Sequence, residues 1–400
     1  MFTGNKHVNQ FKASEFSFYG QPVKMSVKDY ENVYKNIRSL CSQNKGVLSV
    51  YTFGEAEVPG ISDIDLIFVL KDNSSLPRFL KKNCLDSASN YILFHPFFIV
   101  PEDFMENIAY IYPNSRLNLI YGKKIRIKKL SKKDLNLVYM QLINDVILRH
   151  YPSDFLNVLI SKRINTRMCL LRLNSLHHTF NLFERISGIK KRKWAKISDD
   201  VKELREKWFD LPDKAAKSNL IGLLKTAVYV SLDFVDVYSK FLESKSPKMK
   251  VDSLLFKGIK NRISFVNEWN AADSLSEMIG HYSKHKNFYS VLPMILSWQL
   301  CAYSFAKGAL SSYIRKRLSI KCSVKNISQP LMKRIHILNY QVEYAMKLKH
   351  SHYPCFFPLG FKNTKGIKNK MIYTYIFITD NSILRRILNY TRTNLRFIPI

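Results

Sequence analysis

Two acidic residues that follow a pair of glycines form the part of the sequence best suited to chemistry. Asp63 and Asp65 are two positions apart at the start of an apolar run, and in a strand this spacing points both carboxylates to the same face. Carboxylate oxygens suit Mg²⁺, which keeps further coordination positions for triphosphate oxygens. Gly54 before the loop and Gly60 within it let the backbone approach phosphates closely. The segment therefore predicts in-line attack on a nucleotide phosphate, with one or two Mg²⁺ ions at the acidic pair.

The elements around this pair alternate between helical and extended patterns. Apolar residues repeat at helical spacing over 27–41, and residues 46–53 have the composition of a strand. The pattern then predicts a buried strand that begins at the acidic pair (63–70), a helix (76–84), an extended run (91–100), a helix start at Pro101 and a strand (117–127). Together these elements predict a small mixed α/β domain over residues 1–130.

From about Ser131 the pattern changes to long helical periodicities. Helices are predicted at 135–148, 155–187, 199–208, 219–242, 270–282, 290–317 and 329–347, and extended patterns are rare. We therefore expect a larger, mainly α-helical domain over 131–350. Residues 371–379 are strand-like and 381–390 helix-like, which predicts a small α/β extension over 351–400.

The segment around the acidic pair resembles the signature of the polymerase-β-like nucleotidyltransferase superfamily. That signature is Gly-Ser, then seven to thirteen residues, then Asp-x-Asp/Glu. Here Gly54 and Glu55 take the Gly-Ser place, and seven residues ending in Ser62 lead to Asp63 and Asp65. The run 119–125 also resembles the Leu-Tyr-Gly segment of small nucleotidyltransferases. The resemblance covers about residues 27–127 and implies an α/β (α+β) nucleotidyltransferase-like domain. It implies nucleotide binding by Gly54, Glu55 and Ser62, and Mg²⁺ or Mn²⁺ binding by the two aspartates.

Two positions depart from the family pattern. Glu55 replaces the family Ser and would repel phosphate unless it turns away or joins in metal binding. His95 falls where the family has a third carboxylate. It could be a metal ligand or general base, a mark of lost activity, or simply a core or edge histidine. Glu102, Asp103 and Asp145 are candidate substitutes for that carboxylate.

The resemblance implies transfer of a nucleoside monophosphate from an NTP to an acceptor hydroxyl. A basic helical domain after the catalytic one is similar in layout to antibiotic nucleotidyltransferases and to RNA-tailing enzymes, so RNA is one candidate acceptor. The alternatives are a catalytically inactive relative that binds nucleotide or nucleic acid, and a nucleotidyltransferase that modifies a small molecule or a protein. An isolated Asp-x-Asp is more often a solvated loop, and only the upstream glycine, the apolar strand and the element order favour a site.

Positive charge is concentrated in the C-terminal two thirds of the chain. The sequence has 63 Lys and Arg against 31 Asp and Glu, a formal charge of +32. Residues 1–130 carry 17 basic and 12 acidic residues, or +5, and residues 131–400 carry 46 and 19, or +27. This excess favours RNA or another polyanion as a partner of the C-terminal region. A coding bias toward A·T would raise Lys and Asn together, and is the alternative explanation.

Three weaker patterns point toward nucleic acid. Arg172 and His177 have the Arg-x4-His spacing of a ribonuclease motif, although a helix that presents both side chains on its surface is the favoured explanation. The basic run 190–193 before Trp194 suits phosphate contact and base stacking, and a solvated loop is the alternative. Aromatic residues among lysines over 353–370 could grip a single strand or close a subdomain core.

The cysteines and the apolar runs bear on location. Six cysteines are far apart without a CxxC pair, which predicts neither a disulfide framework nor a zinc knuckle and favours a reducing, cytoplasmic compartment. Residues 1–12 contain no apolar run, so we expect no signal peptide. Residues 288–306 are uncharged, but Pro293, Gln299 and serines dilute them. A buried helix is therefore expected there rather than a membrane span.

Overall fold

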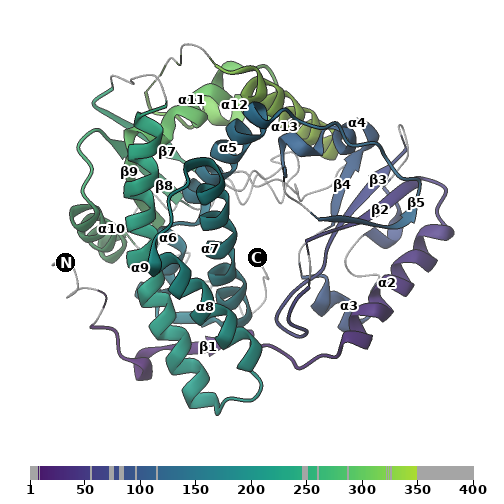
Figure 1. Cartoon of the computed structure of the whole chain (residues 1–400), viewed down its shortest axis with the longest axis horizontal. Coiled ribbons are helices and arrows are strands. Elements are labelled where there is room, and N and C mark those ends of the chain that lie inside the picture. The colour runs from purple at the N-terminus through teal and green to yellow at the C-terminus, as the bar shows by residue number, and fades with distance from the viewer. Residues whose placement is uncertain are drawn as a thin grey trace, which may run out of the picture.

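The computed structural model describes residues 10–54, 56–71, 76–80, 85–94, 97–113, 116–245, 251–258, 261–285, 288–320 and 327–348, with Val8, Cys322 and Val324. The predictions for Glu55, for His95 and for residues 351–400 lie outside these residues. Figure 1 shows a four-stranded sheet with its helices on the right and a larger helical part on the left, and α13 (Gln329–Lys347) runs along the top between them.

The N-terminal sheet has the strand order β4-β3-β2-β5. Its members are β2 (Val47–Phe53), β3 (Asp65–Leu70), β4 (Phe98–Pro101) and β5 (Leu117–Gly122). β2 lies antiparallel to β3 and β5, and β3 lies parallel to β4. The four strands predicted for this domain are present, but β3 begins at Asp65 and leaves Asp63 in the preceding loop. β4 covers only the end of the extended run predicted over 91–100, whose first two residues belong to a helix.

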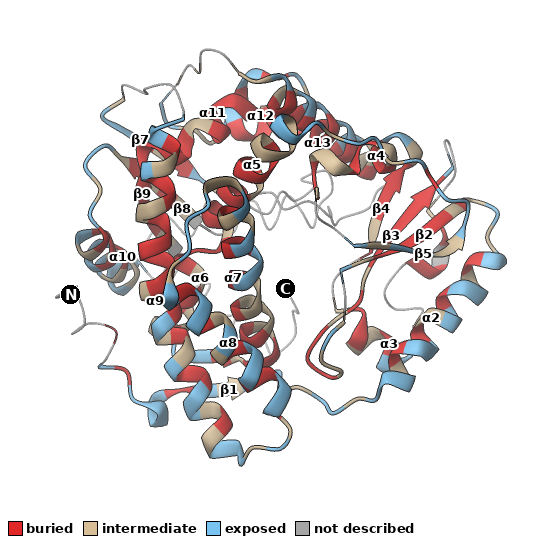
Figure 2. Ribbon diagram, in the orientation of Figure 1, coloured by how far each residue is buried: buried red, intermediate tan, exposed pale blue. Residues whose placement is uncertain are grey.

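The two faces of this sheet belong to different cores. Leu66, Phe68 and Leu70 pack with α2 (Val27–Ser42) and α3 (Ser87–Ile92), whereas Ile67 and Val69 belong to the core shared with the helical part. Side chains alternate between the faces of a strand, so Asp65 lies on the face away from α2. On that face α4 (Glu102–Glu106) and α13 pack against β4, and β3 and β4 are largely buried, as Figure 2 shows.

The larger part is mainly helical, as predicted. It contains α5 (Lys132–His150), α6 (Ser153–Ser161), α7 (Thr166–Ser187), α8 (Arg192–Lys207), α9 (Asp213–Glu243), α10 (Ala271–His285), α11 (Trp298–Phe305) and α12 (Ala309–Arg315). The short β1 (Ser17–Tyr19) pairs in parallel with β6 (Arg163–Asn165), so the chain begins against this helical part before it enters the N-terminal sheet.

Four secondary-structure predictions are wrong in detail. The helix expected over 155–187 is broken at Lys162, which has φ 54° and ends α6. Strands β7 (Ser253–Lys257), β8 (Asn261–Val266) and β9 (Phe288–Pro293) form a sheet where extended structure was thought rare. Consequently the helix expected over 290–317 is β9, the 3-10 turn η5 (Met294–Ser297), α11 and α12. The helix predicted over 76–84 is, in the part of it that the structure describes, only the 3-10 turn η2 (Arg78–Leu80).

A buried arginine joins the helical part to the N-terminal unit. Arg334 of α13 is fully buried and donates to the carbonyls of Tyr110 (2.8 Å) and Ile111 (2.9 Å), and to Asp145 Oδ2 (2.7 Å). Gln299 Nε2 donates to the other Asp145 oxygen at 2.8 Å. A buried ion pair of this kind is tolerated only when further hydrogen bonds satisfy it, so these contacts fix how α5 and α13 meet.

The structure contains one disulfide among its described residues. Cys301 and Cys322 are joined with their Cα atoms 5.9 Å apart, a spacing compatible with a disulfide, whereas Cys41 and Cys169 are buried free thiols. The expectation of no disulfide did not anticipate this pair, because only the fold brings residues 21 positions apart into contact. Within the described residues, no helix is long and apolar enough to cross a membrane.

A candidate carboxylate site at the end of the sheet

The two aspartates lie where β3 begins, at the end of the sheet that faces the helical part. Asp65 is paired with Phe53, the last residue of β2. Phe53 packs edge-on against Phe98 and Tyr112 on the same face of the sheet. Asp65 is therefore held at the border of an apolar core, with Asp63 just before it in the loop.

The environment of Asp65 disfavours its negative charge. Burial raises the pKa of Asp65 well above its usual range, and the neighbouring Asp63 carboxylate raises it further. Its Oδ1 atom is buried and has no hydrogen-bond partner among the described residues. Two carboxylates this close cannot both be charged at low cost without a compensating cation. Asp65 therefore favours either its protonated form or a positive charge placed beside it.

The loop between β2 and β3 needs glycine at two positions. Gly54 has φ +82° and Gly60 has φ +85°, a region that L-residues rarely adopt. At Gly60 a Cβ would also lie 2.3 Å from the Val23 carbonyl oxygen, whereas at Gly54 it would meet nothing within 4 Å. Gly60 is thus required for close packing, and Gly54 leaves an open backbone surface at the end of β2.

Tyr30 of α2 holds this loop from one side. Its hydroxyl donates to the Ser62 carbonyl at 2.5 Å and accepts from the Gly60 amide at 3.0 Å. Tyr91 holds the loop in a similar way, because its hydroxyl donates to the Gly60 carbonyl at 2.5 Å and accepts from the Val23 amide. The turn that leads into Asp63 is therefore fixed by two tyrosines of the N-terminal unit.

Arg167 of α7 holds the same loop from the helical part. It is 3% exposed and donates to the carbonyls of Ile61 (3.0 Å), Ser62 (3.0 Å) and Tyr91 (2.5 Å). Its guanidinium also lies 4.0 Å from the centre of the Tyr91 ring. A planar fork of donors suits such a set of carbonyls, so α7 and the acidic loop are joined through one side chain.

Arg205 of α8 is the second arginine at the loop. It is 2% exposed, donates to Ser62 Oγ at 3.0 Å and lies 3.6 Å from a carboxylate oxygen of Glu57. It also interacts electrostatically with Asp63, although burial lowers its pKa. Ser62 itself is 4% exposed and its hydroxyl also accepts from the Val58 amide at 3.0 Å. The predicted nucleotide-binding Ser62 is thus placed beside the aspartates with its hydroxyl used inside the protein.

The proposed substitutes for a third carboxylate lie elsewhere. Pro101 pairs with Leu70 at the far end of β3, so Glu102 and Asp103 are displaced by about 16 Å along the strand from Asp65. Glu102 pairs instead with Lys123 at 3.2 Å. Asp145 is the buried partner of Arg334. Strand direction thus places Glu102 and Asp103 away from the pair, and Asp145 is committed to its ion pair with Arg334.

The acidic pair fits a cation that shares its coordination with a substrate. Mg²⁺ is commonly held by one or two carboxylates, with water and phosphate oxygens in its other positions. Asp63 and Asp65 offer such a pair, with the Asp65 Oδ1 atom unpartnered among the described residues. Those residues contain no group of three or more His, Cys, Asp or Glu that could enclose a metal. Asp63 and Asp65 are therefore the carboxylates at this end of the sheet that could hold a metal ion.

The basic run before Trp194 has a structural role. Trp194 is 3% exposed, stacks on Phe180 and donates to Asp233 Oδ2 at 3.0 Å. Lys191 and Lys193 both pair with Asp233. The interpretation of Trp194 as a base-stacking surface is wrong, because the ring belongs to the core.

The Arg-x4-His residues point in different directions. Arg172 contacts Asp154 at 3.2 Å and His150 Nε2 at 2.7 Å, whereas the exposed His177 contacts Asn181 at 2.9 Å. Because Arg172 is committed to a cluster between α5, α6 and α7, this pair does not form the expected joint site.

Comparison with known proteins found no match: no family model, no curated protein and no solved structure resembles this chain significantly. The site must therefore be judged on its geometry. Arg167 and Arg205 are the residues that sequence reasoning missed, and no local motif marks them, because they are ordinary helix residues until the two parts meet.

Proposed function

We propose that this chain is a Mg²⁺- or Mn²⁺-dependent nucleotidyltransferase that binds an NTP at Asp63 and Asp65. The observation that carries the proposal is the buried, unpartnered Oδ1 of Asp65 beside a second carboxylate, at a sheet end with an open glycine backbone. A cation bound there would relieve the repulsion and supply charge for triphosphate oxygens. The resemblance of residues 54–65 to the nucleotidyltransferase signature gives the reaction class.

The proposed reaction transfers a nucleoside monophosphate to an acceptor hydroxyl. The acceptor oxygen forms a bond to the α-phosphorus while the bond from that phosphorus to the bridging oxygen breaks, and pyrophosphate leaves with the electron pair. The hydroxyl proton passes to a carboxylate of the pair or to solvent. Tyr30, Arg167 and Arg205 position Asp63 by fixing its loop, and Gly54 leaves room at the strand end.

The basic helical part supports a polyanionic acceptor such as RNA. Residues 131–400 carry +27 of the total charge, and phosphate contacts by Lys and Arg make binding strongly salt-dependent. We expect affinity for single-stranded RNA to fall steeply as salt rises. RNA binding that is absent even at low salt would exclude this acceptor and leave a small molecule or a protein side chain.

A second candidate function is nucleotide binding without catalysis. Arg205 brings a buried positive charge to Asp63, which is where a catalytic cation would be needed. An arginine in this place could compensate the carboxylates permanently, and the protein would then bind its ligand without transferring a phosphate.

One pair of measurements separates these functions. The full chain is incubated with each labelled NTP and Mg²⁺ or Mn²⁺, beside the double variant D63N/D65N and the matched surface variant D200N, whose aspartate pairs with Lys196. Thermal unfolding is followed with and without Mg²⁺. We expect transfer, and a rise in melting temperature with Mg²⁺, in wild type and D200N only.

The outcomes have distinct meanings. Nucleotide binding without transfer supports the second candidate. If D63N/D65N still transfers a nucleotide, the aspartates do not form the site. If Mg²⁺ stabilises the double variant as much as wild type, the pair is not the cation site.

A further inference from the structure

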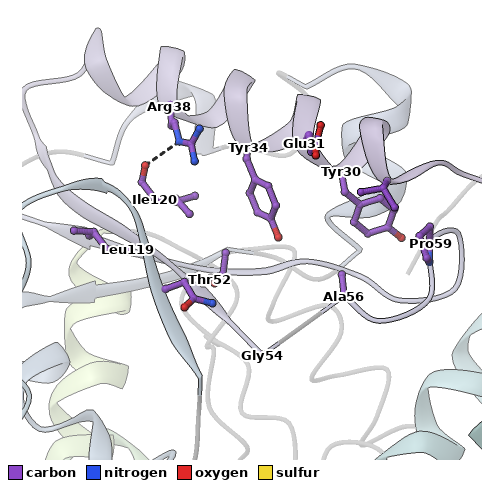
Figure 3. A pocket seen from close by; sticks show the side chains of 12 residues that line it. Tyr30, Glu31, Tyr34, Arg38, Thr52, Gly54, Ala56, Pro59, Leu119 and Ile120 are labelled. Atoms are coloured by element: carbon purple, nitrogen blue, oxygen red, sulfur yellow. Dashed lines mark hydrogen bonds between the residues drawn. The ribbon is translucent and has the colours of Figure 1, made fainter.

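A cavity lies on the opposite face of the N-terminal sheet from Asp65. It has a volume of about 490 Å³ and opens between α2, the end of β2, the loop after Gly54 and β5. This volume is typical of small-molecule sites. Figure 3 shows Tyr34 projecting from α2 across the cavity toward Gly54, with Thr52 and Ala56 on the strand and loop side.

Several polar groups converge on this cavity without partners of their own. Thr52 is 7% exposed, and its Oγ1 atom makes no hydrogen bond within the described residues. Asn118 is directly opposite Thr52 in the β2–β5 register, so the two side chains are neighbours on one face. For the Asn118 amide, the Tyr34 hydroxyl and the Glu31 carboxylate, the described residues provide no hydrogen bond or ion pair. Among these groups only the Thr52 hydroxyl is buried without a partner, whereas Glu31 and Asn118 are exposed, so a ligand would replace water at those two residues.

The rest of the lining is mainly apolar. Apolar and aromatic residues line the cavity from both sides: Val27, Tyr30, Ala56, Pro59, Leu119 and Ile120. Tyrosine rings offer planar surfaces on which an aromatic ring can stack. A planar ligand is therefore favoured over a branched or flexible one.

The charge of the cavity argues against a phosphate ligand. Glu31 and Arg38 both line it, and their charges cancel. Arg38 also donates its Nε to the Ile120 carbonyl at 3.1 Å. A neutral ligand with both donors and acceptors suits this balance, because an asparagine amide can pair with an amino group and a ring nitrogen at once, and the Glu31 carboxylate accepts from an amino group.

We propose that this cavity is a binding site for a neutral amino-substituted aromatic heterocycle of the adenine type. The site is separate from the carboxylate pair and does not depend on the proposed transfer reaction. It is nevertheless connected to the acidic loop, because Tyr30 forms its wall and bonds to Gly60 and Ser62.

Isothermal titration of the full chain with adenosine, without a divalent cation, tests the proposal. We expect saturable binding that weakens by about tenfold or more in T52V and in N118A, since each loses a hydrogen bond to the ligand. Inosine, which has a carbonyl in place of the amino group, is expected to bind more weakly than adenosine. The control D200N should bind adenosine as wild type does.

The variants also report on their own folding. T52V removes a buried hydroxyl that lacks a partner, so its unfolding free energy should equal or exceed that of wild type. Stable T52V with weakened adenosine binding therefore supports a ligand contact. Absence of saturable heat with millimolar adenosine, or equal affinity of wild type, T52V and N118A, overturns the site. Neither result affects Mg²⁺-dependent NTP transfer, so failure here is distinguishable from failure of the proposed function.

Discussion

The joint made by Arg167 leads to a quantitative prediction. In R167A the carbonyls of Ile61 and Tyr91 lose a charged donor, at about 1–3 kcal/mol each. Loss of the contact with the Tyr91 ring adds about 1 kcal/mol. Folding of R167A no longer has to order an arginine side chain, and this saving in conformational entropy offsets about 2 kcal/mol. The free energy of unfolding should therefore fall by about 3 kcal/mol.

Urea denaturation followed by circular dichroism measures this change. The control is R192A, because Arg192 is an exposed arginine at the start of α8 and its loss should cost less than about 0.5 kcal/mol. R167K keeps the charge but not the planar fork, so it should fall between wild type and R167A. R167A as stable as R192A would refute the reasoning that this side chain joins α7 to the acidic loop.

Two further predictions concern buried polar groups of the helical part. Burial is the main cause that lowers the pKa of His150 to about 3, with Arg172 adding to it. The unfolded chain takes up this proton near pH 6.5, so stability present above that pH is lost as the pH falls toward about 3. Wild type should lose about 2 kcal/mol of unfolding free energy between pH 6.5 and pH 5, and H150Q should not show this loss. Urea denaturation at each pH measures it, and identical pH profiles of the two proteins would contradict this. For the ion pair of Arg334 and Asp145, R334M should lower the unfolding free energy by about 3–5 kcal/mol because an unpaired buried carboxylate remains. The double variant D145L/R334M should be less destabilised than R334M, and an additive double-mutant cycle would argue against coupling.

Much of the N-terminal unit could be read from the sequence. The continuous apolar run from Leu66 to Leu70 predicted a buried strand, and helical spacing over 27–41 predicted α2. Local pattern is sufficient there because each element buries a face set by its own periodicity. The two glycines before Asp63 both have positive φ, and their predicted close approach to phosphate stays a prediction.

The helical part was predicted less well where tertiary contacts outweigh local preference. Residues 288–306 are apolar enough for either helix or strand, and pairing of β9 with β8 decides for a strand at the start of the run. Trp194 after a basic run resembles a surface motif, but burial beside Phe180 and Phe234 makes it a core residue. Short apolar runs do not reveal their partners.

The candidate site shows the same division. The sequence by itself determined that two carboxylates begin a buried strand after a glycine-containing loop, because spacing and alternation are local properties. Only the tertiary structure decided that Arg167 and Arg205 meet that loop and that Glu102 lies at the far end of the sheet. The cavity between α2 and β5 also depends on the packing of elements separated by more than seventy residues. Contacts between distant segments follow from how buried faces fit together, and no single segment carries that information.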